Sequence, residues 1–361
     1  MHSARRPLLI AVRGLDPVGT GRQAELLALG LAASGRDLHV AVTSTGSGIA
    51  PRLRAAGIPV HEVGRRPLPD VAAAVRLAAL ARRLRAGVVV SFGRRQAALA
   101  AAARLAVPGL RAVVQAAVPA RTGRAGRVVR AADAVVAASD EIAESIRRCG
   151  VADRRVATVP PGIAADATAT LPREAVAERL GLDPECQWTL SVAPLVAEAR
   201  LERLIWGIDQ LGVVRRGMQH VLVGSGPQLK RILRRARVQE LAERLFVFPR
   251  CPLLPDLLGQ ITYAWQSGET PFGGAILDAM ARGVPAVAVT SAAVRQLVAH
   301  GETGWIVPAD PESEFPRRAF TMLENPDEMA RFAAAARARA AEVFPVDRMV
   351  AGFAAAIDDL A

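Results

Sequence analysis

Short apolar runs of strand character alternate with Ala-, Leu- and Arg-rich helical segments along almost the whole chain. Such alternation predicts βαβ units, which build parallel sheets covered by helices. In the first part of the chain the expected strands are Leu8–Val12, Leu38–Val42, Val88–Ser91, Ala112–Gln115, Ala134–Ala137 and Val156–Val159. Helices are expected between them, near 22–34, 70–85, 95–105, 122–131 and 140–148.

The pattern breaks after Pro160-Pro161-Gly162-Ile163, and residues 164–185 have the composition of an interdomain connection. A second series follows, with expected strands at Trp188–Val192, His220–Val223, Leu245–Phe248, Ile261–Ala264 and Ala286–Val289. Its helices are expected near 200–211, 227–237, 274–282, 312–323, 327–343 and 347–360. A chain of 361 residues suits two domains. We predict an α/β fold with domains 1–165 and 166–340, and a C-terminal helix in 341–361 that packs back on the first domain.

Positive charge is concentrated in the first half of the chain. Residues 1–165 hold 25 Arg and 10 acidic residues, whereas residues 166–361 hold 21 basic and 24 acidic residues. This excess favours an anionic partner, such as a membrane surface, a lipid phosphate or a phosphorylated acceptor, and Arg121, Arg124, Arg127 and Arg130 are spaced to form a stripe on one helix. The alternative is a solvated helix face. Nucleic acid is not expected as a partner, because aromatic residues make up only 4% of the chain.

Several classes of protein are disfavoured by what the sequence lacks. It has no charge-free apolar run of about 18 residues and no secretory leader, which predicts a cytoplasmic protein. Cys149, Cys186 and Cys251 are far apart, and the five histidines show no spacing typical of metal sites. We therefore expect no metal and no cofactor.

Three glycine-containing loops are candidate ligand sites. Gly273 and Gly274 precede a short apolar-periodic run, which predicts bare N–H groups at a helix N-terminus, with Asp278 one turn further on. The loop Gly14–Arg22 and the turn at Gly224–Pro227 each follow an expected strand. The alternative in each case is an ordinary tight turn or packing turn.

These segments resemble the glycosyltransferases of family 4 type, which have the GT-B fold. The pattern E-G-F-G-x-x-x-x-E-A-M-A-x-G-x-P, followed by G-E-T-G, is matched at Phe272-Gly273, Ala279-Met280-Ala281, Gly283, Pro285 and Gly301–Gly304. The glycine loop Gly19-Thr20-Gly21-Arg22 and the segments Asp133–Ser139, Val159–Ile163 and Gly224–Pro227 are similar to other family motifs. Ser139 is expected to cap the helix that follows it.

The resemblance implies two Rossmann-like, doubly wound domains with a cleft between them. It implies transfer of a sugar from a nucleotide-sugar donor to a saccharide or lipid-linked acceptor, with retention at the anomeric carbon. The donor would be bound by Gly273, Gly274, Asp278, Thr270, Arg200 and Gly224, and the phosphates and acceptor side by Gly19, Thr20, Gly21 and Arg22. The basic first domain would contact the acceptor, and through it the inner face of the membrane.

The match is imperfect where the family carries charged groups. The two glutamates of the family fall on Thr270 and Asp278, and its donor-clamping arginine and lysine fall on Pro194 and Ala199. Its first-domain histidine falls in the strand that ends at Phe92. Glu269 and Arg200 are the candidates for catalytic compensation. The alternative function is a catalytically degenerate relative that binds a nucleotide-sugar, a glycan or a protein without turnover; an epimerase of the same fold is a third hypothesis, supported by fold analogy alone.

Overall fold

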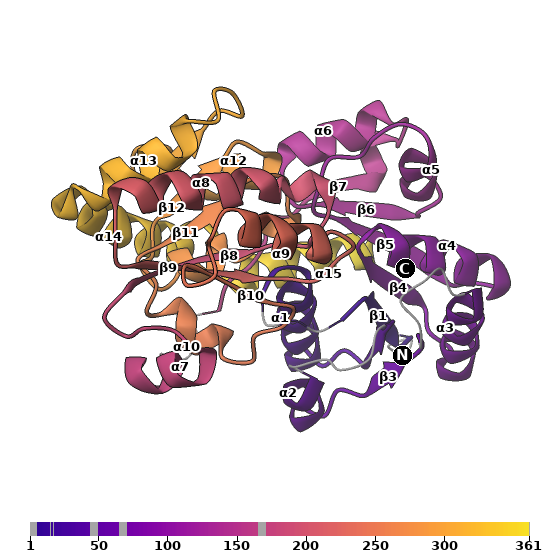
Figure 1. Ribbon diagram of the computed structural model, residues 1–361. Coiled ribbons are helices and arrows are strands. Elements are labelled where there is room, and N and C mark those ends of the chain that lie inside the picture. Colours follow the sequence, from indigo (N-terminus) through magenta and orange to yellow (C-terminus); the bar gives the residue numbers. More distant parts are fainter. Residues whose placement is uncertain are drawn as a thin grey trace. The chain divides into compact units, whose positions relative to one another are not determined.

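The computed structural model describes residues 6–14, 16, 18–43, 50–64, 71–164 and 171–360, apart from the side chains of residues 124 and 125 (Figure 1). The chain divides into two compact units. Unit 1 comprises Met1–Ala164 and Phe344–Ala361, and unit 2 comprises Ala165–Val343. The final helix therefore belongs to the same unit as the N-terminal segment.

Unit 1 is built on a parallel sheet whose strands follow the order β3-β2-β1-β4-β5-β6-β7. Its strands are β1 (Leu8–Val12), β2 (Leu38–Val42), β3 (Val60–Glu62), β4 (Val88–Phe92), β5 (Arg111–Ala116), β6 (Ala134–Ala137) and β7 (Val156–Thr158). The helices are α1 (Gly19–Ala33), α2 (Ala50–Ala55), α3 (Val71–Leu84), α4 (Arg94–Ala106), α5 (Arg124–Arg130), α6 (Asp140–Arg148) and α15 (Val346–Asp358), with a 3-10 turn η1 at Asp153–Arg155. Ser139 caps α6, because its hydroxyl accepts the N–H of Ile142 at 3.3 Å, as the sequence predicted.

Helix α15 packs directly on α1, although the two are separated by the whole of unit 2 in the sequence. A Cβ atom on Gly30 of α1 would lie only 2.3 Å from a methyl group of Val350. The chain enters this helix through a backbone pairing, in which Ile163 N–H donates to Phe344 O at 2.8 Å and Val346 N–H donates to Ile163 O at 3.1 Å. Unit 1 is therefore completed by the last residues of the chain.

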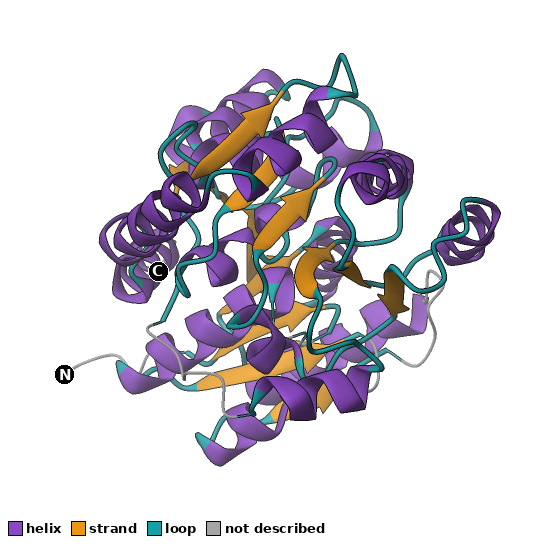
Figure 2. Ribbon diagram, turned by 60° about the vertical axis from the view of Figure 1, so that its left-hand side comes forward, coloured by secondary structure: helices purple, strands orange, loops and turns teal. Residues whose placement is uncertain are grey.

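Unit 2 repeats the same topology, with the parallel strand order β10-β9-β8-β11-β12-β13. In Figure 2 its strands, like those of unit 1, run between helices. The strands are β8 (Gln187–Val192), β9 (Met218–Val223), β10 (Leu245–Phe248), β11 (Tyr263–Gln266), β12 (Ala286–Val289) and β13 (Gly304–Val307). The helices are α7 (Arg173–Leu180), α8 (Leu201–Val214), α9 (Leu229–Val238), α10 (Leu254–Leu258), α11 (Ile276–Met280), α12 (Ala292–Leu297), α13 (Glu314–Leu323) and α14 (Pro326–Val343), with 3-10 turns η2 (Ala197–Ala199) and η3 (Pro271–Gly273).

In both units the strand order reverses direction next to the first strand, between β1 and β4 and between β8 and β11. In open α/β sheets of this kind, ligands bind outside the carboxyl ends of the strands at such a switch point. The topology therefore predicts ligand binding at the loops that leave β1, β4, β8 and β11.

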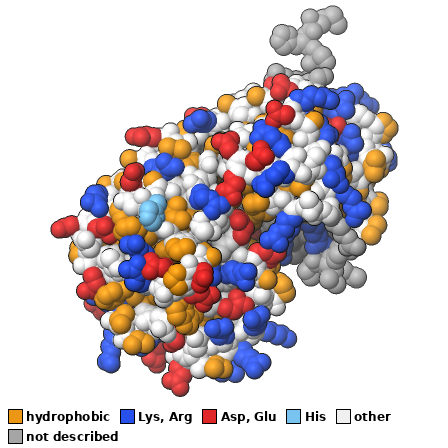
Figure 3. Space-filling model, turned by 90° about the horizontal axis from the view of Figure 1, so that it is seen from above, with side chains coloured by type: hydrophobic (Ala, Val, Ile, Leu, Met, Phe, Trp, Pro, Cys, Tyr) orange, Lys and Arg blue, Asp and Glu red, His pale blue; other side chains and the backbone are white. Residues whose placement is uncertain are grey.

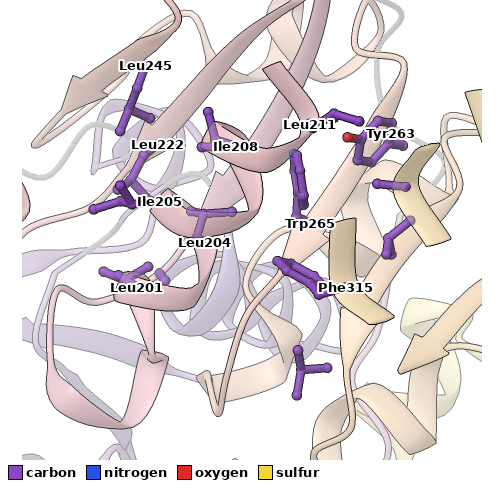
Figure 4. Packing of buried hydrophobic residues seen from close by; sticks show 14 of the residues in the cluster. Leu201, Leu204, Ile205, Ile208, Leu211, Leu222, Leu245, Tyr263, Trp265 and Phe315 are labelled. Atoms are coloured by element: carbon purple, nitrogen blue, oxygen red, sulfur yellow. The ribbon is translucent and has the colours of Figure 1, made fainter. Parts of the chain in front are cut away.

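The core of unit 2 is centred on Trp265, whose ring lies 5.1 Å from those of Tyr263 and Phe315 (Figure 4). Its indole N–H donates to the hydroxyl of Thr189 at 2.7 Å, and that hydroxyl lies 2.6 Å from Nδ1 of His220. Burial is the main reason that the pKa of His220 falls from 6.5 to about 3, and the nearby charge of Arg244 lowers it further. The histidine is therefore neutral inside the folded unit.

Several short elements differ from the sequence prediction. β3, β13, α2, α7, α10 and α12 were not predicted, and β11 was expected at Ile261–Ala264 but lies at Tyr263–Gln266. Tyr263 pairs with Thr189 of β8, so tertiary pairing sets this register rather than the apolar run itself. α5 begins at Arg124, so Arg121 precedes the helix and the predicted arginine stripe does not extend to it.

A double-mutant cycle tests the contact between α1 and α15. We expect Gly30→Ala to destabilise the protein by about 1–3 kcal/mol, because the new methyl group overlaps Val350. In a Val350→Ala background the same change should cost much less, because both methyl groups are gone and only the Cβ atom of residue 350 remains, 3.2 Å from the new one. Urea denaturation of the four variants gives the coupling energy, and additive effects would contradict the packing described here.

The buried His220 predicts a specific loss of stability in acid. The unfolded chain binds this proton below about pH 6.5, whereas folded His220 does not until about pH 3. Stability from this group is therefore complete above pH 6.5 and falls by up to about 1.4 kcal/mol per pH unit below it. Urea denaturation between pH 8 and pH 5 should show a smaller acid slope for His220→Asn than for wild type; equal slopes would contradict the assignment.

Candidate functional site

The loops that leave β8, β9 and β11 approach one another at the carboxyl edge of the unit 2 sheet, and glycines make the close approach possible. A Cβ atom on Gly224, after β9, would lie 1.9 Å from Ala193 O in the loop after β8. On Gly274, after β11, it would lie 2.2 Å from Val192 O, and on Gly268 it would lie 2.5 Å from Glu198 O. The structure thus gives a direct basis for the alternative in which Gly224 belongs to a packing turn.

Hydrogen bonds connect the same loops. Leu195 N–H donates to Ser225 O at 3.0 Å, joining the loops after β8 and β9. Glu269 N–H donates to Glu198 O at 2.9 Å, and the hydroxyl of Ser267 donates to Ala199 O at 2.8 Å, joining the loops after β8 and β11. The residues predicted at the donor site from distant parts of the sequence are therefore brought to one edge of the sheet.

Gly273 and Gly274 do not present the bare N–H groups that the sequence predicted. Both have positive φ, and their N–H groups donate to Thr270 O at 3.2 Å and to Pro271 O at 3.1 Å within the turn η3. A Cβ atom on Gly273 would lie 2.7 Å from Leu297 Cδ1. These glycines shape the loop, and α11, which follows them, has only five residues.

The polar side chains of this loop are mostly buried. Thr270 is 1% exposed, and its hydroxyl makes no hydrogen bond to the described part of the chain. Asp278, on α11, is 6% exposed, and Glu269 is half-buried. Gln266, at the end of β11, was not predicted as a site residue; its amide donates to Gly268 O at 3.1 Å and holds the loop from inside. Its place at the carboxyl end of a strand was the available signal.

Two sites where the family carries functional side chains, the charged clamp at Ala199 and the histidine in the strand that ends at Phe92, are apolar and buried here. Ala199 is fully buried in the core of unit 2, and Phe92, in unit 1, is buried against Phe353 with 6.0 Å between ring centroids. Arg200 follows Ala199 and is exposed, with φ 50° and ψ 44° in the left-handed region, where it precedes α8. A cation is therefore present at this edge, one residue later than the resemblance implied.

The first-unit loop places its residues at the start of α1, after β1. Gly19 has a φ of 59°, Thr20 is half-buried in the first turn, and a Cβ atom on Gly21 would lie 2.3 Å from Asp16 N. Arg22 was expected to close over phosphates, but it is buried and its guanidinium lies 2.6 Å from Glu25 Oε2. The spacing of three residues on one helix was a signal for this pair.

No group of three or more His, Cys, Asp or Glu side chains is arranged to hold a metal ion in the described part of the chain. His39 Nδ1 and His61 Nε2 lie 3.1 Å apart on β2 and β3. The pKa of His61 is lowered, first by burial and then by the charges of His39 and Arg83. Among the described helices, none is long and apolar enough to cross a membrane.

A matched pair of glycine variants tests the close approach of the loops. Gly274 and Gly217 both have positive φ, but only Gly274 has backbone within reach of a new Cβ atom. We expect Gly217→Ala to cost about 1–2 kcal/mol through backbone strain alone. Gly274→Ala should cost about 1–3 kcal/mol more because of the overlap with Val192 O. Urea denaturation measures both; equal costs would show that the loop relaxes without penalty.

Comparison with known proteins places the chain among glycosyltransferases. Residues 172–339 match the family described as glycosyl transferases group 1, and residues 17–167 match Glycosyltransferase Family 4. D-inositol 3-phosphate glycosyltransferase 2 of Catenulispora acidiphila is 27% identical over 219 residues, which are 57% of this chain and 51% of that protein. The corresponding enzyme of Streptomyces scabiei is 28% identical over 229 residues, 59% of this chain and 51% of that protein. The chain thus spans about half the length of the curated relatives that it matches.

Solved structures agree with the fold over both units. HepE of Anabaena, in complex with UDP-glucose, superimposes with a TM-score of 0.81 at 18% identity, covering 98% of this chain and 99% of that one. Sucrose-phosphate synthase of Thermosynechococcus elongatus gives a TM-score of 0.78 at 16% identity, covering 99% of each chain. At these identities the likeness concerns the fold. Together with the two family matches and the two switch-point sheets, it means that the chain belongs to the family 4 and group 1 glycosyltransferases of GT-B fold.

Proposed function

We propose that this protein binds a nucleotide-sugar at the carboxyl edge of the unit 2 sheet and transfers its sugar, with retention, to a saccharide or lipid-linked acceptor. The observation that carries the proposal is the convergence of the loops after β8, β9 and β11 at the switch point, where Gly224, Gly268 and Gly274 leave no room for side chains. Loops fixed in this way can hold a ligand without reorganising.

Each part of the donor has a proposed contact. The carboxylate of Asp278 would accept hydrogen bonds from ribose hydroxyls, which is a usual role for an acidic residue in Rossmann-like domains. Arg200, and the hydroxyl of Thr270, would face the diphosphate, whose negative charge grows as the sugar leaves. Glu269 directly precedes Thr270 in the loop after β11, and its carboxylate is proposed to contact the reacting sugar. The relative HepE was crystallised with UDP-glucose, which supports a nucleotide-sugar as the donor class.

The acceptor is proposed to contact unit 1. The excess of arginine in residues 1–165 would attract an anionic acceptor or the membrane surface that carries it. The names of the curated relatives, which act on D-inositol 3-phosphate, support a phosphorylated acceptor. On the face shown in Figure 3, basic and acidic side chains are interspersed over much of the surface, whereas basic ones predominate toward the right-hand side. A solvated basic surface is the alternative to an anionic partner.

A second candidate function is binding without turnover. It is favoured by the full burial of Ala199 and Phe92, which commits two positions of the family's charged machinery to apolar cores. The loss of one group aimed at developing charge commonly costs about 10²–10³ in rate. Unless Arg200 or Glu269 compensates, this protein would recognise the donor and leave it intact.

Binding and turnover assays on the same preparation separate the two functions. Wild type is titrated with UDP-, GDP- and ADP-sugars, and hydrolysis and transfer to phosphorylated and lipid-linked acceptors are measured. We expect at least one sugar nucleotide to bind, with Asp278→Asn weakening its affinity by about 10-fold to 100-fold through loss of charged hydrogen bonds. Asp209→Asn, on α8, is the control and should bind as wild type does.

The outcomes have distinct meanings. Binding followed by transfer supports the enzyme. Binding with no transfer to any acceptor supports the degenerate relative instead. A preparation that melts cooperatively and binds no sugar nucleotide contradicts both functions.

A further inference from the structure

Helix α9 has a larger excess of positive charge than any other helix described in unit 2. Five of its ten residues are cations and none is acidic; the cations are Lys230, Arg231, Arg234, Arg235 and Arg237. The rest of residues 166–361 has the opposite balance, because removing these five from the 21 basic residues leaves 16 against 24 acidic ones. An arginine-rich composition alone would spread its excess over all the helices, so the concentration on α9 needs a local explanation.

The helix presents its cations to the outside. Ile232 and Ala236, one turn apart, are buried on its inner side. The outer side is exposed and consists of three cations and two aliphatic residues, Lys230, Leu233, Arg234, Arg237 and Val238. The aliphatic side chains are well exposed, Leu233 at 46% and Val238 at 75%. These five outer residues are called the α9 surface below.

Ion pairs neutralise little of this charge. Arg231 lies 3.1 Å from Glu202 of α8, the helix that packs beside α9 (Figure 1). The side chains of the other four cations make no ion pair or hydrogen bond with residues that the structure describes. Arg317 of α13, in contrast, lies 2.6 Å from Glu314, one turn earlier on the same helix.

The arrangement is unfavourable for the protein by itself. Lys230 is four residues before Arg234, a spacing at which like charges on a helix repel and destabilise it. The same spacing separates Arg231 from Arg235. Lys230 and Arg231 also lie in the first turn, where the positive end of the helix dipole disfavours cations. Contact with an anionic surface would remove these costs.

We propose that the α9 surface is a membrane-docking site that binds the headgroups of anionic phospholipids. Clusters of Lys and Arg on a helix are typical of binding sites for acidic lipids, and each cation near the membrane adds to the affinity. Exposed aliphatic side chains beside them can enter the boundary between headgroups and acyl chains. A lipid surface offers both phosphate and hydrocarbon to this mixed face, whereas an acidic peptide offers mainly charge.

This site differs from the surfaces already proposed for the sugar donor and the acceptor. It lies in unit 2, apart from the excess of arginine in residues 1–165. No residue of α9 belongs to the proposed donor site. Docking through α9 can therefore be tested without any sugar nucleotide.

Vesicle binding by the full chain tests the proposal. Wild type and variants are sedimented with vesicles of pure phosphatidylcholine, or of phosphatidylcholine and phosphatidylglycerol in equal amounts, and are titrated with poly-glutamate as a second probe. The cation variant combines Lys230→Gln, Arg234→Gln and Arg237→Gln. The control variant removes the same charge from exposed sites on α7, α14 and α15, through Arg179→Gln, Arg331→Gln and Arg348→Gln.

Wild type should bind the anionic vesicles and not those of phosphatidylcholine. The cation variant should lose about 100-fold in affinity, since each cation contributes roughly 5-fold, whereas the control variant should lose much less. Leu233→Ser combined with Val238→Ser should weaken binding by about 3-fold to 10-fold, because less apolar area is buried. The cation variant should melt at or above the temperature of wild type, since like-charge repulsion is removed.

Several outcomes would overturn the proposal. Failure of wild type to bind anionic vesicles would exclude lipid docking, and binding of poly-glutamate in that case would indicate an acidic protein partner instead. If the cation variant binds the anionic vesicles as tightly as wild type, the arginines of residues 1–165 carry the membrane contact and α9 does not. None of these results depends on nucleotide binding, so failure of the proposed function would leave the test of α9 intact.

Discussion

Unit 2 depends on close contacts between backbone segments, with no side chain between them, at the end of β8. Ala193 O, Val192 O and Glu198 O each lie closer to a neighbouring glycine than any side chain would permit. These contacts fix the path of the loop after β8, and that path fixes the start of α8. They act at the point where the sheet reverses its strand order, so the geometry of the switch point and the geometry of the candidate site have one origin.

The same constraint explains how charge is distributed at this edge. The carbonyl oxygen of Ala199 accepts a hydrogen bond from the Ser267 hydroxyl, and the Ala199 side chain packs in the core of unit 2. A charged side chain at this position would therefore be buried in a packed interior, which is unfavourable. Arg200 is the next residue and points out of that core, at a cost in backbone strain. The loop therefore accommodates a positively charged side chain at residue 200 and excludes one at residue 199.

The sequence was sufficient for the layout of the two units and insufficient for their details. Alternating apolar runs predicted both parallel sheets, because a strand, a helix and a strand connect in essentially one way. β13 was not predicted. The reason for glycine at its first position is visible only in the structure, where a Cβ atom on Gly304 would lie 2.2 Å from Ala286 O on the neighbouring strand. The N–H groups of Gly273 and Gly274 were mispredicted, because the turn that consumes them has no periodic signature.

Helix α15 gives the chain an unusual order of assembly during translation. Residues 6–164 are synthesised first, yet the helix that covers α1 is encoded after all of unit 2. At ribosomal speeds, the intervening residues 165–343 occupy on the order of 10–40 s. Unit 2 has all its own segments as soon as it is made, whereas unit 1 waits with the α15-contacting face of α1 uncovered. Unit 1 is thus the half of the protein that emerges earliest and is completed last.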